Sequence, residues 1–163
     1  MKKIVIIALT LFCLNLFSLE IGVKGGYMMG VTDSFKDYSA FPAFGFDLGM
    51  SFAILKVSGE FMYFVSKHKD YSDLKIKDAA LNANASLKVP FVGIYGGAGV
   101  GIHFVKSEAP GYSSDTESKT GFNIFAGYEL PIPLISPYIE LRYVNVKDNL
   151  SHFMALVGIN LGF

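Results

Sequence analysis

Three kinds of residue in this sequence could carry chemistry: histidines, one serine–histidine pair and a set of isolated charges. The histidines are His68, His103 and His152, and the adjacent pair is Ser151-His152. A serine beside a histidine is the combination that a hydrolase or an acyltransferase uses as nucleophile and base. The pair lies at the start of an alternating segment, however, and adjacent residues of a β-strand point to opposite faces. We therefore expect no catalytic dyad and no enzyme.

The same histidines raise the question of a metal site. His103 and His152 fall on segments that we do not expect to be neighbours, and His68 lies in a charged stretch. The one cysteine, Cys13, belongs to the apolar run at the start of the chain. Since no convergent pair of carboxylates accompanies the histidines, the sequence predicts neither a metal site nor a cofactor.

Isolated charges inside otherwise apolar segments form the third set. Each falls on the polar face of a segment in which apolar residues occupy every second position, and four are positive against five negative. Glu20 is one of them, and the other eight, which we expect to form a charge network, are Lys24, Asp47, Lys56, Glu60, Lys88, Glu129, Glu140 and Arg142. An unpaired charge in a confined interior costs several kcal/mol, so near-balance implies mutual neutralisation. We expect Arg142 to reach Glu60 or Asp47.

The segments that carry these charges show the two-residue period of β-strands. In the clearest one, residues 44–52, large apolar side chains alternate with Gly45, Asp47, Gly49 and Ser51. Eight such segments cover residues 20–29, 44–52, 55–66, 79–89, 91–105, 121–130, 138–146 and 152–163. The alanine-rich residues 78–85 are also compatible with a helix. We favour a strand there, because Asn82 and Asn84 recur after two residues and not after three or four.

Two architectures use eight alternating strands: a soluble barrel that buries its apolar face and a membrane barrel that turns it outward. The polar face here is mostly Gly, Ser, Asn and Ala, a set that suits a confined lumen. The segments also have about the length that a tilted membrane-crossing strand requires. We predict an all-β fold, an eight-stranded antiparallel up-and-down transmembrane β-barrel. The residues expected to face lipid in its two clearest strands are Phe44, Phe46, Leu48, Met50, Phe52, Val157, Ile159 and Leu161.

Two short segments and the final strand carry a family resemblance. The segments are YGGAGVGI at residues 95–102 and YIELRY at residues 138–143, and the alternating final strand ends in Phe163. Together they resemble the small outer-membrane β-barrel families that include OmpX, OmpW and the opacity-type proteins, over essentially the whole mature chain. The resemblance implies insertion among the lipids of a bacterial outer membrane. It also implies that the barrel assembly machinery reads Phe163 as its signal.

The first eighteen residues have the layout of a secretory signal peptide. Lys2 and Lys3 precede an uncharged run from Ile4 to Phe17, and the small Ser18 follows. We expect residues 1–18 to be removed and residues 19–163 to form the barrel. Removing two of the 14 basic residues leaves 12 against 14 acidic ones, a formal charge of −2, with no basic block. Nucleic acid is therefore not an expected partner.

The connections between the alternating segments differ in length and charge, and this difference predicts which end of the barrel carries the function. Those after the first, third, fifth and seventh segments (30–39, 67–73, 106–120 and 147–151) are longer or more charged, whereas Ala53 and Ile54 form a tight turn. Loops on a rigid scaffold commonly carry function. We expect a closed, charge-paired lumen and a structural or surface-interaction role through the loops. One alternative is a narrow porin-like channel for small solutes, because eight strands can enclose a partly hydrated lumen. A lipid A-modifying barrel enzyme is a less favoured alternative.

Overall fold

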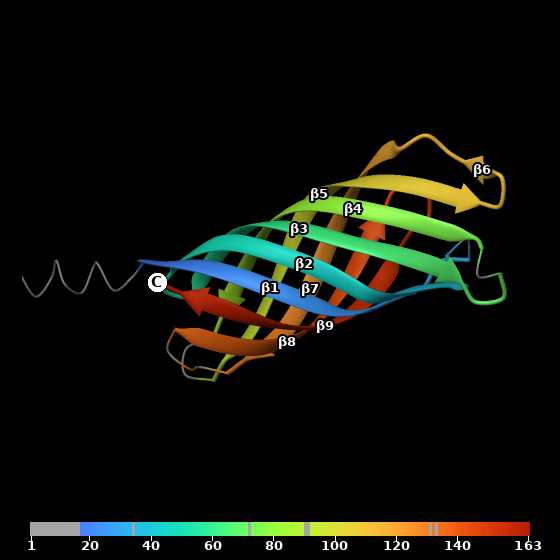
Figure 1. The fold of residues 1–163 in the computed structure, drawn as a ribbon. Helices are drawn as coiled ribbons and strands as arrows, with labels where there is room; N and C mark the ends of the chain where they lie inside the picture. Colours follow the sequence, from blue (N-terminus) through green and yellow to red (C-terminus); the bar gives the residue numbers. More distant parts are fainter. Residues whose placement is uncertain (1–16, 34, 72, 90–91, 131, 133) are drawn as a thin grey trace, which may run out of the picture.

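The computed structural model describes residues 17–33, 35–71, 73–89, 92–130, 132 and 134–163. Within these ranges the chain forms nine strands. They are β1 (Phe17–Gly30), β2 (Tyr38–Phe52), β3 (Leu55–His68), β4 (Lys75–Lys88), β5 (Ile94–Ala109), β6 (Tyr112–Ser113), β7 (Glu117–Glu129), β8 (Ile135–Val146) and β9 (His152–Gly162). β6 is a two-residue strand that pairs only with the end of β5, at Glu108 and Ala109. The remaining eight strands are long and tilted (Figure 1).

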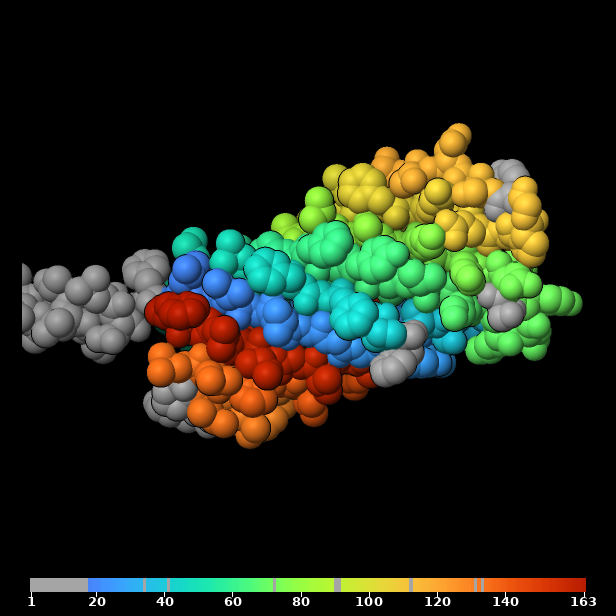
Figure 2. Space-filling model, viewed as in Figure 1, coloured from blue at the N-terminus to red at the C-terminus, as the bar shows by residue number. Residues whose placement is uncertain are grey.

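The eight long strands close into one antiparallel barrel. Their hydrogen-bonded order is β4-β3-β2-β1-β9-β8-β7-β5, and pairing of β4 with β5 completes the circle. The seam between the two ends of the chain runs from Glu20 opposite Gly162 to Gly30 opposite His152. Figure 2 shows the blue residues of β1 beside the red residues of β9 along it. The predicted all-β, eight-stranded antiparallel barrel is confirmed, and residues 78–85 are strand.

Several strands extend beyond the segments that the alternation marks. β2 begins at Tyr38, β4 at Lys75 and β8 at Ile135, and β5 continues to Ala109. These extensions are polar or interrupted by proline, so they lack an apolar period, yet their backbones still pair with neighbouring strands. The loops after β1 and β5 are correspondingly shorter than expected. β1 also starts at Phe17, two residues before the expected start of the barrel, whereas residues 1–16 lie outside the described part and their role as a signal peptide stays a prediction.

The strands separate two faces with opposite exposure. β1 begins and β9 ends at one end of the barrel, the terminal end, and the long connections lie at the other, the loop end (Figure 1). The eight residues expected to face lipid all lie on the outer surface and are exposed, from Met50 at 64% to Leu161 at 39%. In the described part of the chain no helix is long and apolar enough to cross a membrane.

Candidate functional site

The side chains inside the barrel form two layers, one charged and one apolar. The charged layer occupies the half toward the terminal end and contains all nine charges named from the sequence. The apolar layer occupies the half toward the loop end. Together the two layers determine whether anything can pass through the barrel.

Arg142, the single arginine of the chain, is the centre of the charged layer and is 2% exposed. It lies on β8 and crosses the lumen to Glu60 on β3, where Nη2 donates to Oε2 at 2.8 Å and Nη1 donates to Oε1. Its Nε also donates to Glu140 at 3.0 Å. The ring of Phe125 lies 4.8 Å from the guanidinium carbon and covers one face of it. The planar guanidinium is therefore held on its edges by two carboxylates and on one face by an aromatic ring.

A chain of ion pairs continues from Glu60 toward the terminal end. Lys24 lies 2.5 Å from Glu60 and 3.5 Å from Asp47. Lys56 lies 3.5 Å from Asp47 and 2.7 Å from Glu20. Asp47 thus lies between two lysines. Of the two carboxylates expected for Arg142, Glu60 forms the ion pair.

A second group of charges lies beside this chain. Lys88 is 2.5 Å from Glu129, which also accepts a hydrogen bond from Asn160 at 3.1 Å. The hydroxyl of Tyr95 donates to Glu140 at 3.0 Å, and so connects this side of the lumen with Arg142. The structure brings all eight residues of the expected network into one half of the lumen.

Three polar or aromatic partners of the network did not follow from the sequence argument. Asn82 donates to Glu60 at 3.0 Å, Tyr95 reaches Glu140, and Phe125 packs on Arg142. Asn82 and Tyr95 lie on the polar face of the alternation, so the sequence predicts that they point into the lumen but not which residues they contact. Phe125 is a large aromatic residue on the inward side of β7, where small or polar residues were expected.

Beneath Arg142 the lumen widens into a cavity of about 240 Å³. Ala53 and Ile54, which form the turn between β2 and β3, lie at its mouth at the terminal end, and charged side chains of the network line it. Arg142 and Phe125 belong to its lining at the inner end. The space therefore extends from the terminal end to the centre of the barrel.

The outer half of the lumen is largely apolar, whereas the sequence predicted an inward face of mostly Gly, Ser, Asn and Ala. The residues of this apolar layer are Met28, Phe35, Ala40, Ala43, Met62, Phe64, Ala80, Val144, Val146, Met154 and Leu156. Phe35 comes from the connection after β1 and is 2% exposed. The error has a physical cause: Met28, Met62 and Met154 alternate with lipid-facing residues, so the period marks them as inward without showing that they gather at one level of the barrel.

A buried Asp78–His103 pair lies within the apolar layer. Nδ1 of His103 is 2.9 Å from a carboxylate oxygen of Asp78, and the ring centroids of His103 and His152 are 6.5 Å apart. Their strands are not neighbours, yet the narrow lumen brings the two rings together in an edge-on arrangement, with an angle of 78° between their planes. Even so, no group of three or more His, Cys, Asp or Glu residues that could hold a metal ion occurs among the described residues.

Ser151 and His152 take separate partners. The Ser151 hydroxyl accepts a hydrogen bond from the Asn145 amide at 3.1 Å. Nδ1 of His152 donates to the backbone oxygen of Leu150 at 3.0 Å, and its ring packs edge-on against Phe64. Because Nδ1 of His152 donates its proton to a backbone carbonyl, this nitrogen cannot accept a proton from Ser151 and so cannot activate it as a general base.

The geometry can be compared with that of known proteins. No model of a protein family matches the sequence, and no curated protein matches it. Solved structures do match. Neisserial surface protein A, NspA, is 13% identical with a TM-score of 0.70, over 90% of this chain and 97% of that one. The chain has the fold of the small eight-stranded outer-membrane β-barrels.

Two further structures show the same eight-stranded outer-membrane barrel fold. The N-terminal β-barrel domain of OprF from Pseudomonas aeruginosa is 17% identical with a TM-score of 0.62, and Ail from Yersinia pestis is 21% identical with a TM-score of 0.58. In both comparisons 90% of this chain is covered, together with 97% of the other chain. These identities are low, so the likeness concerns the fold and not the loops or the lumen side chains.

Proposed function

We propose that this chain is an outer-membrane β-barrel with a closed, charge-paired lumen, and that it serves a structural or surface-interaction role through its outer loops. The observation that carries the proposal is the double obstruction of the lumen. Arg142, Glu60 and Phe125 close it at the centre, and the apolar layer fills it from there to the loop end. A barrel whose lumen is blocked at two levels is suited to contact partners through its outer loops and not to conduct ions or solutes.

The pairing of the central charges supports this role. Arg142 and Glu60 are each no more than 3% exposed, and both lie between partners of opposite charge. A charge-selective pore uses rings of charged side chains that water and ions can reach. Here the charges satisfy one another, so they hold β3 and β8 together across the lumen.

The contacts among the outer connections support the presentation of a defined surface. The amide of Val31 donates to the backbone oxygen of Ser151 at 3.0 Å, and the Thr32 hydroxyl donates to the backbone oxygen of Asn149. Lys119 lies 2.8 Å from Asp148. Loops that are fixed to one another lose less conformational entropy when they bind a partner.

The similar structures support the location and the role. NspA, the OprF domain and Ail are outer-membrane proteins, and Ail has been solved in complex with the heparin analogue sucrose octasulfate. By analogy, we assign this chain to the bacterial outer membrane, among its lipids, with surface ligands contacted through the loops. In this proposal residues 1–18 are an export signal, Phe163 is read by the assembly machinery, and the chain is not an enzyme.

Conductance and gel migration test the proposal together. The purified chain, refolded in detergent, should migrate differently on a denaturing gel before and after heating, as a folded barrel does. In planar bilayers the same sample should give no steady conductance. Large, steady channels from folded protein would contradict the closed lumen and favour the narrow porin-like channel. Unchanged migration on heating would contradict the membrane barrel itself.

The surface role needs its own measurement. Cells that produce the chain with residues 110–116 replaced by a short Gly-Ser linker should keep the barrel in the outer membrane but lose binding to host or matrix material. If wild-type and linker variants bind equally while both reach the surface, the connection between β5 and β7 has no such role. The linker variant leaves the lumen intact, so a loss cannot come from the charged layer.

A further inference from the structure

The charged residues that point away from the lumen gather at one place on the barrel wall. In the described strands, the charged side chains on the outward side of the alternation are Lys67, Lys75, Lys77, Lys106 and Glu108. All five lie at the loop end of β3, β4 and β5. We call the four cations the lysine patch. With Glu108 its formal charge is +3, on a wall that is otherwise apolar or uncharged.

The strand register places these lysines opposite one another. Lys67 pairs with Lys75, and Lys75 pairs in turn with Glu108. Lys77 pairs with Lys106 in the row below. Directly opposed like charges destabilise a sheet. An anion beside these two adjacent rows would offset the repulsion within each lysine pair.

Within the part of the chain that the structure describes, one carboxylate, Glu108, pairs with the patch. Lys77 lies 2.7 Å from Glu108 and donates a hydrogen bond to it. Lys75 lies directly opposite Glu108 in the strand register, and Lys106 precedes Glu108 by two residues on the same face of β5, so three lysines are neighbours of a single carboxylate. In the described part of the chain no carboxylate lies within ion-pair distance of Lys67, Lys75 or Lys106.

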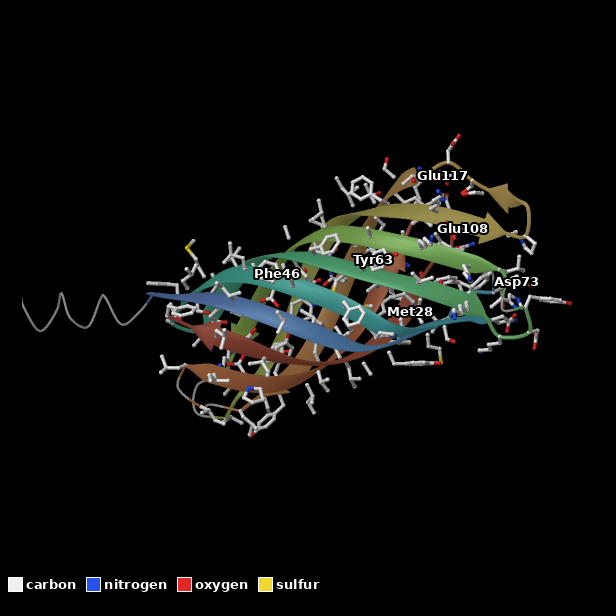
Figure 3. The ribbon with its side chains drawn as sticks, in the orientation of Figure 1. Met28, Phe46, Tyr63, Asp73, Glu108 and Glu117 are labelled. Atoms are coloured by element: carbon white, nitrogen blue, oxygen red, sulfur yellow. The ribbon has the colours of Figure 1, made fainter. Side chains whose placement is uncertain are left out.

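The patch lies just above an aromatic row that marks the edge of the apolar band. Tyr63 and Phe104 flank Ala79 in that row, one step below Lys77 and Lys106. Figure 3 shows Tyr63 on this wall and Glu108 further toward the loop end. Two residues of a strand tilted by about 40° rise about 5 Å, so the two lysine rows lie roughly 5 and 10 Å above the aromatic row. Aromatic residues sit at headgroup level, which puts the lysines at the depth of phosphate groups.

We propose that the lysine patch binds the phosphate groups of a phosphorylated lipid in the outer leaflet. The inference rests on the proposed outer-membrane location, because it requires the aromatic row to lie at a membrane surface. The position of the patch favours a lipid over a soluble polyanion: the lysines are on the wall beside the membrane and not on the tips of the loops. Ammonium groups on adjacent strands can contact several oxygens of one phosphate, or two phosphates of one headgroup.

Lipid binding by the folded chain in zwitterionic detergent tests the inference. Native mass spectrometry measures the affinity for bisphosphorylated lipid A and for the same lipid after removal of both phosphates. One lysine beside an anionic surface contributes roughly fivefold. The triple variant Lys75→Gln/Lys77→Gln/Lys106→Gln should therefore bind the phosphorylated lipid about 100-fold more weakly. Glu108→Gln, which removes the competing carboxylate, should bind it about fivefold more tightly.

A matched control removes the same charge from the loops: Lys36→Gln/Lys69→Gln/Lys147→Gln should bind within about twofold of wild type, because these lysines lie away from the wall. Equal losses in both triple variants, or equal binding of the dephosphorylated lipid, would overturn the inference. So would displacement of the lipid by sucrose octasulfate or inorganic phosphate at comparable concentration, which would indicate a soluble anion. Wild-type protein that fails to fold in detergent would instead refute the proposed barrel function.

Discussion

Replacing Arg142 by methionine is the most direct test of the charged layer. Methionine matches the aliphatic stem of arginine but has no guanidinium, so Glu60 and Glu140 lose the hydrogen bonds that they accept from Arg142, and Phe125 loses its cation. Glu60 retains Lys24, whereas among the described residues Glu140 retains only the hydroxyl of Tyr95. The substitution therefore leaves one buried carboxylate without a cation.

The expected cost follows from burial. Breaking a buried ion pair by removing one partner typically costs about 3–5 kcal/mol, because the remaining charge is desolvated without compensation. We expect a loss of this size for Arg142→Met, and a partial recovery of about 1–2 kcal/mol when Glu140→Gln is added, since the amide is neutral and still accepts the Tyr95 hydrogen bond. Lys88→Met is the matched control. The Lys88 side chain is 36% exposed, so its pair with Glu129 is partly hydrated and its loss should cost about 1 kcal/mol or less.

Urea unfolding of the refolded proteins in zwitterionic detergent measures these free energies. The fraction folded at each urea concentration is read from the heat-modifiable gel band, and the slopes should agree between variants if the same surface unfolds. The reasoning is refuted if Arg142→Met loses no more stability than Lys88→Met. It is also refuted if Glu140→Gln deepens the loss in the Arg142→Met background.

Three further outcomes are expected. A Cβ on Gly99 would come 2.7 Å from the backbone oxygen of Ala83, whereas one on Gly59 would meet nothing within 4 Å. Gly99→Ala should therefore destabilise the barrel by about 1–3 kcal/mol in the same urea assay, while Gly59→Ala should leave the free energy of unfolding nearly unchanged. Equal effects of the two substitutions would contradict close packing on the lumen side of the wall. Phe64→Ala should cost about 3–5 kcal/mol through the void it leaves in the apolar layer, and a normal urea midpoint would show that this layer is not tightly packed. If Phe163 is the assembly signal, Phe163→Ala should lower the amount of folded protein in outer-membrane fractions several-fold without changing the urea midpoint of the refolded chain, and unchanged amounts would remove that role.

The sequence by itself determined on which side of the barrel wall the residues of the eight alternating segments lie. The two-residue period is a local property of an extended backbone, so Phe46 and Asp47 are assigned to opposite faces without knowledge of any neighbour. Eight such segments, each long enough to cross a bilayer, together predicted the closed antiparallel barrel. Glu60 and Glu140 were therefore assigned to the inside together with Arg142, and the near-balance of the inward charges predicted that they pair.

Only the tertiary structure decided which residues meet and at what depth. Arg142 on β8 reaches Glu60 on β3 because the stagger of the closed barrel puts them at one level on opposite sides of a narrow lumen, and a period of two contains no information on stagger. The same closure gathers Met28 and Met154 into an apolar layer, and brings His103 to His152 across the lumen. On the outer wall, register between β4 and β5 places Lys77 beside Lys106. These contacts join residues far apart in the chain, and the geometry of closure that sets them belongs to the whole barrel and to no single strand.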